Sequence, residues 1–130
     1  MSFVDKSQFT ALGKRATVFT QFDLIEVRPE LTHVSMHSSE LSSFCPVTEQ
    51  PDFYDVLIEI EPDKYTIETK TMKLYLQKFR NEPMFAEAMA CIIANDIFDA
   101  AKPRAIKVSL TQQVRGGIQL KAVAERKQDE

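Results

Sequence analysis

Residues 55–80 read DVLIEIEPDKYTIETKTMKLYLQKFR, a stretch in which strand spacing gives way to helix spacing. Residues 55–61 alternate apolar and acidic side chains, a period of two that is typical of a half-buried strand. A proline-containing turn follows at residues 61–64, and residues 65–68 can return as a partner strand. Residues 70–80 carry apolar side chains at helical spacing, which predicts a helix. The stretch therefore predicts a domain that mixes strands with helices.

The flanking segments extend this pattern. After Pro83, apolar side chains recur at steps of three and four, which predicts a second helix to about Ala101. Residues 106–111 and 118–124 alternate in the strand period, with Gly116 and Gly117 between them. Residues 31–37 could form another strand. The predicted order ββααββ describes an α+β domain with a four-stranded antiparallel sheet and two helices on one face.

The remaining segments lack a clear period. Residues 1–29 are expected to form an extended arm or loops, and residues 126–130 a frayed tail. Residues 38–53 are polar and contain two prolines, so they are expected to form a structured loop. A length of 130 residues predicts a single domain over residues 1–130. The open sheet would leave two edges, which favours a homo-oligomer.

Composition narrows the classes of function. A net charge of −3 argues against a general nucleic-acid binder, so no direct nucleic-acid partner is expected. No apolar run is long enough for a signal peptide or a membrane span, so a cytoplasmic location without membrane contact is expected. The two cysteines are too few for a disulfide framework, and neither has metal-ligand spacing, so no metal site is expected.

The first candidate site is FCPVTEQPD at residues 44–52. Cys45 lies in a segment stiffened by Pro46 and Pro51, and Asp52 can fold back toward its thiol. A soft nucleophile next to a proton donor suits attack on a nitrile. Spacing alone leaves the commoner alternative open, in which Cys45 is a small buried side chain.

Two further places could carry chemistry. Lys70 and Lys73 lie in the first turn of the predicted helix, where cations are unfavourable unless an anion such as phosphate binds there. A solvated lysine face is the alternative explanation. Glu87 lies one turn before Cys91 and could bind the N–H groups of a guanine-like base. An exposed structural glutamate explains the pattern equally simply.

Together these motifs resemble one family. Residues 44–52 are similar to its CPxTxQPD signature, and residues 68–75 resemble its cofactor signature ESKSxKxY. The match continues with LQKFRN at residues 76–81 and RGGI at residues 115–118. The chain thus resembles the short, single-domain NADPH-dependent 7-cyano-7-deazaguanine reductases of queuosine biosynthesis, a tRNA modification pathway.

The resemblance implies a fold, a reaction and a set of residues. The fold would be the tunnelling fold, assembled into rings as a homodecamer of two pentamers with sites between subunits. Cys45 would form a covalent thioimide with 7-cyano-7-deazaguanine, and Asp52 would be the proton donor. The substrate would be bound by Ile67, Glu68, Thr69, Ala86 and Glu87. The phosphates of NADPH would be held by Lys70, Lys73 and Arg115.

The chain departs from the family pattern in places. Threonines replace the usual serines at Thr69 and Thr71, which keeps both hydroxyl groups. Ala86 stands where the family usually has a histidine, and the family's second cysteine lies closer to the glutamate than Cys91 does. A reversible Cys45–Cys91 disulfide that protects the nucleophile is a further hypothesis.

Two other functions are also compatible with parts of this sequence. One is an amidinotransferase of the archaeosine pathway, which would form the same thioimide and add ammonia to a nitrile in tRNA. Lys70 and Lys73 argue against it because those proteins lack the lysine-bearing motif. The other is a tunnelling-fold protein that binds a purine or pterin without catalysis, which the presence of both Cys45 and Asp52 argues against.

Overall fold

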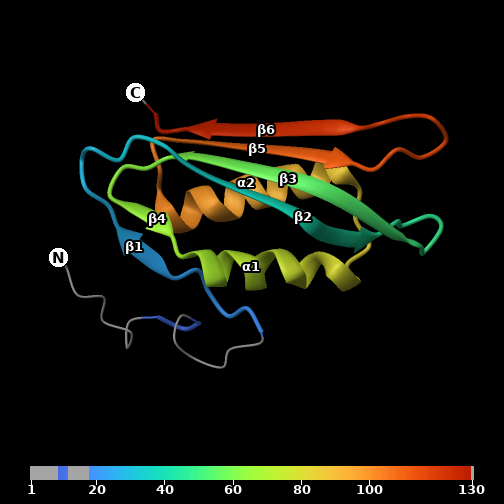
Figure 1. Ribbon diagram of the computed structural model, residues 1–130, viewed down its shortest axis with the longest axis horizontal. Helices are drawn as coiled ribbons and strands as arrows, with labels where there is room; N and C mark the ends of the chain where they lie inside the picture. Colours follow the sequence, from blue (N-terminus) through green and yellow to red (C-terminus); the bar gives the residue numbers. More distant parts are fainter. Residues whose placement is uncertain (1–8, 12–17, 130) are drawn as a thin grey trace.

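A computed structural model describes residues 9–11 and 18–129 of the chain. The elements in order are β1 (Leu24–Glu26), β2 (Val34–Phe44), β3 (Pro51–Glu61), β4 (Tyr65–Ile67), α1 (Thr69–Gln77), η2 (Lys78–Asn81), α2 (Ala86–Ala101), β5 (Ala105–Gln112) and β6 (Lys121–Lys127). The main sheet has the order β2-β3-β5-β6 and is antiparallel throughout. Both α-helices lie against one face of it (Figure 1). The predicted α+β architecture is therefore confirmed.

The core lies between this sheet and the two helices. On β3 the alternate side chains Val56, Ile58 and Ile60 are completely buried, while Glu61 at the end of the strand is exposed. Burying an aliphatic side chain of this size contributes about 1.5–3 kcal/mol, so the alternation fixes which face of β3 meets the helices. The helix α2 buries its own stripe at the spacing predicted from sequence, with Met89, Ile93 and Ile97 buried.

The loop predicted at residues 38–53 is much shorter than expected. Strand β2 continues through Phe44, and β3 begins at Pro51, so residues 45–50 alone connect them. The polar composition misled the prediction because β2 is an edge strand, and most of its side chains are exposed or half-buried. Pro51 is tolerated because it is the first residue of its strand. This extension brings Phe44 and Pro51 opposite each other at the loop.

The prediction that residues 65–68 return as a partner of β3 is wrong. Strand β4 instead pairs with β1 in a separate two-stranded sheet, with Leu24 opposite Ile67. Residues 1–29 are therefore not purely an arm or loops, although residues 1–8 and 12–17 lie outside the described part. The pairing of β1 with β4 is continued by one more hydrogen bond, in which the Glu68 N–H donates to the Asp23 carbonyl at 2.8 Å. The N-terminal segment thus borders the start of α1.

The C-terminal strand lies later than predicted. It begins at Lys121 rather than at residue 118, because a longer connection with positive φ angles at Gly116 and Gly117 precedes it. Residues 126 and 127 belong to the strand, so the frayed tail predicted there is wrong for these residues. The Arg126 guanidinium lies 3.9 Å from the Phe98 ring centre of α2. No helix in the described ranges is both long and apolar enough to cross a membrane.

Candidate active site

Cys45 lies in the short loop between β2 and β3. The Cys45 N–H donates to the Gln50 carbonyl at 2.9 Å, and the Cys45 carbonyl accepts from the Glu49 N–H at 2.9 Å. Glu49 adopts a left-handed backbone conformation with φ of 58°, which closes the loop tightly. The Cys45 side chain is half-buried and its thiol is free. The loop therefore holds the thiol in a fixed place that remains open to a small molecule.

The surroundings of Cys45 favour its thiolate form. The pKa of the thiol is lowered from its ordinary value of 9.0, chiefly by a hydrogen bond from the Thr48 hydroxyl. The backbone N–H groups of Thr48 and Val47 act in the same direction, whereas burial and the nearby Asp52 charge oppose them. A thiol with a lowered pKa and partial exposure is typical of a nucleophile rather than of an inert core cysteine.

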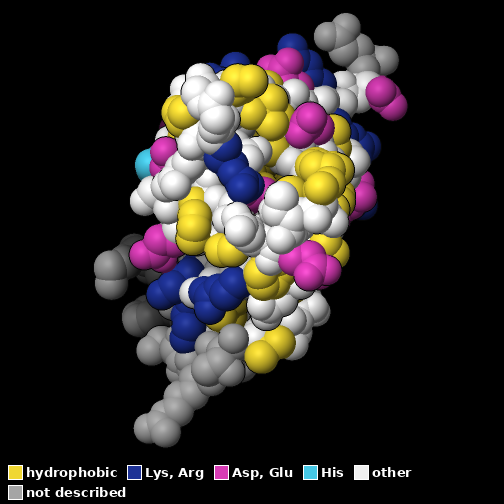
Figure 2. Space-filling view, turned by 90° about the vertical axis from the view of Figure 1, so that its right-hand side faces the viewer, with side chains coloured by type: hydrophobic (Ala, Val, Ile, Leu, Met, Phe, Trp, Pro, Cys, Tyr) yellow, Lys and Arg dark blue, Asp and Glu magenta, His cyan; other side chains and the backbone are white. Residues whose placement is uncertain are grey.

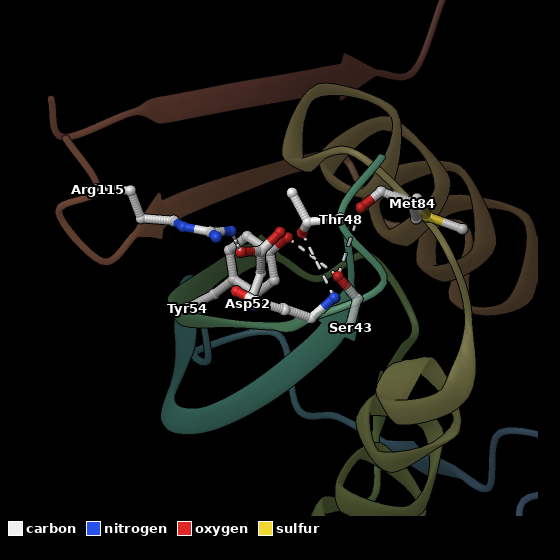
Figure 3. A network of polar contacts seen from close by, with 7 residues as sticks. Ser43, Thr48, Asp52, Tyr54, Met84 and Arg115 are labelled. Carbon is white, nitrogen blue, oxygen red and sulfur yellow. Dashed lines mark hydrogen bonds and ion pairs between the residues drawn. The ribbon is translucent and has the colours of Figure 1, made fainter. Parts of the chain in front are cut away.

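Asp52 lies near Cys45 in the fold, because its neighbour Pro51 is opposite Phe44, the residue before Cys45. It is the second residue of β3, directly opposite Ser43 on β2, and it is 5% exposed. Its carboxylate forms an ion pair with the guanidinium of Arg115, which lies on the connection between β5 and β6 and points toward Asp52 (Figure 3). The structure therefore brings Cys45, Asp52 and Arg115 to one end of the sheet.

A pair of buried hydroxyl groups lies beneath this cluster. The Tyr54 hydroxyl is 3.0 Å from the Ser43 Oγ, which in turn donates to the Met84 carbonyl at 3.4 Å (Figure 3). Burial raises the pKa of Tyr54, so its hydroxyl keeps its proton at neutral pH. Sequence reasoning missed this pair. The alternation along β3 could have predicted it, because Tyr54 is two positions before Val56 and therefore faces the core.

The start of α2 is held against the same loop. The Phe44 N–H donates to the Glu82 carbonyl and the Phe44 carbonyl accepts from the Met84 N–H, both at 3.0 Å. Ala86 is buried at the first position of α2, whereas Glu87 and Cys91 are exposed. Glu87, the second residue of α2, therefore follows a segment that is hydrogen-bonded to Phe44, the residue before Cys45.

Glu68 has a structural role that was not predicted. Its carboxylate caps α1 by accepting from the N–H groups of Lys70 at 2.7 Å and Thr71 at 2.9 Å. These two N–H groups are therefore not free to bind a phosphate. Glu68 and Ile67 are both buried next to the start of α1, the end of the helix that lies away from the cysteine loop (Figure 1).

Lys73 lies in a groove between β2 and α1. The groove has a volume of about 320 Å³ and also includes Thr69, Gln77 and His37 in its walls. The start of α1, which carries Lys70, lies well away from the tip of the β5–β6 hairpin, which carries Arg115 (Figure 1). A single chain therefore does not bring the two lysines together with Arg115.

Comparison with known proteins places the chain in a family. Residues 51–130 match a family model described as QueF-like protein. An NADPH-dependent 7-cyano-7-deazaguanine reductase from Syntrophus aciditrophicus is 38% identical, covering 95% of this chain and 89% of the relative. The chain belongs to the QueF-like family. Reductases of the same name from Nitrosomonas eutropha and Nitrosospira multiformis are 42% and 39% identical, covering 72% and 73% of the chain and 68% of each relative.

A solved QueF-like structure has the same fold. The apo form of an archaeosine synthase QueF-Like matches with a TM-score of 0.69 at 21% sequence identity, covering 72% of this chain and 92% of that chain. This structure supports the fold, and the family model and the reductase relatives confirm the family resemblance expected from the motifs. The matched family region begins at residue 51, so it contains Asp52, both helices and Arg115 but not Cys45.

An apolar rim surrounds the cysteine end of this family member. Five large hydrophobic side chains are exposed there, on the β2–β3 loop, the start of β3, the approach to α2 and the β5–β6 hairpin: Val47, Phe53, Phe85, Val114 and Ile118. Figure 2 looks onto this end and shows hydrophobic side chains spread among charged ones.

Proposed function

We propose that this chain catalyses the NADPH-dependent reduction of the nitrile of 7-cyano-7-deazaguanine to 7-aminomethyl-7-deazaguanine, a cytoplasmic step of queuosine biosynthesis. The names of its relatives support this reaction. The observation that carries the proposal is the half-buried Cys45 thiol with a lowered pKa, next to the buried Asp52 carboxyl group. Nitrile chemistry needs this combination of a soft nucleophile and a proton-transfer group.

The chain's own residues perform the first bond-forming step. Cys45 Sγ attacks the nitrile carbon, and the electron pair of one carbon–nitrogen π bond moves to the nitrogen. Asp52 delivers to that nitrogen the proton that the thiol gives up, which leaves a neutral thioimide on Cys45. The Thr48 hydroxyl stabilises the negative charge that develops on the sulfur. NADPH, when bound, supplies hydride, and two molecules in turn are needed to reach the amine.

The base of the substrate would bind between the cysteine loop and the start of α2. Glu87 suits the donor edge of a deazaguanine because an ionised carboxylate accepts hydrogen bonds from N–H and NH₂ groups. Ala86, small and buried, leaves space beside the base. Thr69 of a neighbouring copy would contact the base, with Ile67 and Glu68 of that copy behind it, because the start of α1 lies away from the cysteine loop of its own chain (Figure 1).

Lys70 and Lys73 would hold the phosphates of NADPH. The fit rests on their charge and on the groove that Lys73 and Thr69 line, since the Lys70 N–H is already occupied by Glu68. An ammonium group binds phosphate as a point charge, so the contacts need no free helix terminus. Arg115 would contribute from a second copy of the chain, because within one chain the β5–β6 connection that carries it lies away from the start of α1 (Figure 1).

The active chain would be a ring of subunits, with a decamer of two pentamers as the expected form. Strands β2 and β6 are the two edges of the main sheet and could pair with neighbouring copies. The apolar rim around Cys45 would be covered by such a neighbour. This arrangement could bring the lysines of one copy to the cysteine of the next.

A pair of cysteine variants tests the proposal. The protein is incubated with 7-cyano-7-deazaguanine without NADPH, and its intact mass is measured. Wild type and Cys91→Ala should gain the mass of the nitrile, whereas Cys45→Ala should not. An adduct on the Cys45→Ala protein, or the absence of an adduct on wild type, would show that the nucleophile is wrongly assigned.

A further inference from the structure

We propose that Arg115 is a positioning residue for the first chemical step, because it holds the Asp52 carboxylate toward Cys45. Held in this way, Asp52 takes the thiol proton of Cys45 and then passes it to the nitrile nitrogen. This inference rests on the proposed function and deepens it. It gives Arg115 a role in adduct formation, before any cofactor is needed, in addition to the phosphate contact expected from the family resemblance.

Backbone hydrogen bonds fix the conformation of the hairpin that carries Arg115. The N–H and C=O groups of Arg115 and Ile118 bond to each other at 3.0 and 3.1 Å, across a turn in which Gly116 and Gly117 have positive φ angles. The hairpin is joined to β3 by the Gln113 N–H, which donates to the Phe53 carbonyl at 3.0 Å. Phe53 directly follows Asp52, so the base of the hairpin is fixed next to the carboxylate it serves.

The ion pair joins a partly exposed cation to a buried anion. The side chain of Arg115 is 41% exposed, whereas that of Asp52 is 6% exposed. A buried carboxylate needs a compensating charge or hydrogen bonds, because its desolvation is costly. Arg115 supplies that charge at Oδ1, and in this proposal the second oxygen, Oδ2, carries the proton.

The Asp52 charge also acts on the thiol. It opposes the fall in the pKa of Cys45 that Thr48 causes. The two residues are close in the fold because Pro51, next to Asp52, lies opposite Phe44, next to Cys45. A thiol beside a carboxylate does not have to ionise fully before attack, because the carboxylate can remove its proton as the sulfur–carbon bond forms. Asp52 is then protonated at the moment when the nitrile nitrogen gains negative charge.

This step needs no proton donor or acceptor besides Cys45, Asp52 and the nitrile. The S–H bond breaks and its proton moves to Asp52, while the Sγ–carbon bond forms and a carbon–nitrogen π pair moves to nitrogen. Asp52 then gives the same proton to nitrogen. The products are the neutral thioimide on Cys45 and the original Asp52 carboxylate, still paired with Arg115.

The test measures adduct formation without NADPH in wild type, Arg115→Gln, Arg115→Lys and a matched control, Arg104→Gln. Arg104 forms a similar ion pair with Asp63, on strand ends remote from the cysteine loop. Intact-mass time courses at several nitrile concentrations separate the saturating rate from the half-saturating concentration. We expect Arg115→Gln to lower the saturating rate by roughly ten- to a hundredfold, as the loss of part of a proton-transfer contribution would. The half-saturating concentration should change little, Arg115→Lys should retain part of the rate, and the control should match wild type.

A double variant distinguishes positioning from general damage to the fold. If Arg115 acts through Asp52, adding Arg115→Gln to Asp52→Asn should cause no further loss of rate. An Arg115→Gln protein that forms the adduct at the wild-type rate, or a double variant that shows both losses in full, would overturn the inference. A wild-type protein that forms no adduct would instead overturn the proposed function, so the two failures are distinguishable.

Discussion

The cap on α1 leads to a quantitative prediction about stability. Glu68 is 5% exposed, and its carboxylate accepts from two backbone N–H groups at 2.7 and 2.9 Å. A hydrogen bond to a charged group contributes about 1.5–3 kcal/mol, and loss of an N-cap costs about 0.5–2 kcal/mol. These two estimates describe the same contacts, so they are not added together. In the variant, water can also bond to the N–H groups at the start of the helix, which reduces the cost of losing the cap. We therefore expect Glu68→Ala to lower the free energy of unfolding by about 1.5–2 kcal/mol, where the two ranges overlap.

Urea unfolding at fixed protein concentration measures this change. Glu68→Gln keeps one acceptor oxygen but loses the charge that the helix terminus favours, so about half of the loss is expected. Glu125→Ala, at an exposed position on β6, is the control and should stay within about 0.5 kcal/mol of wild type. The reasoning is refuted if Glu68→Ala unfolds like the control while its affinity for 7-cyano-7-deazaguanine falls, because Glu68 would then bind substrate rather than cap the helix.

Other predictions concern the site itself. Thr48→Val should raise the midpoint pH for alkylation of Cys45 by iodoacetamide, since the hydroxyl is the main cause of the lowered thiol pKa; an unchanged midpoint would contradict this. Lys73→Ala should raise the KM for NADPH roughly ten- to a hundredfold, with a smaller effect on adduct formation, which needs no cofactor; an unchanged KM would remove Lys73 from the cofactor site. Asp52→Asn should bind the nitrile but lose turnover, and a near-normal kcat would exclude it as the proton-transfer group. Mild peroxide should link Cys45 to Cys91, and peptide maps with Cys45 oxidised but unlinked would refute that hypothesis.

The sequence predicted the elements whose pattern reports burial directly. The strand β3 and the helix α2 show their periods clearly because each has one buried face and one exposed face. The second half of β2 was missed because it is an edge strand rich in serine, which resembles a loop in composition. The partner of β4 was wrong because a three-residue strand contains too little pattern to choose between neighbours.

The site could be predicted where its members are close in sequence. Cys45 and Asp52 lie seven positions apart in one motif, and the structure places Cys45 directly after the end of β2 and Asp52 at the facing start of β3. The contact of Asp52 with Arg115 joins residues 63 positions apart, so no local pattern could reveal it. The cap formed by Glu68 was hidden for another reason, since glutamate is not among the residues that usually cap helices.

The central claim is that this chain reduces the nitrile through a covalent intermediate on Cys45. It is tested most directly by incubating the protein with 7-cyano-7-deazaguanine and NADPH, following the absorbance of NADPH and identifying the product by mass. The account predicts two NADPH molecules oxidised for each nitrile converted to 7-aminomethyl-7-deazaguanine, with neither change in Cys45→Ala. A protein that forms the adduct without oxidising NADPH, and yields an amidine when ammonia is supplied, would contradict it.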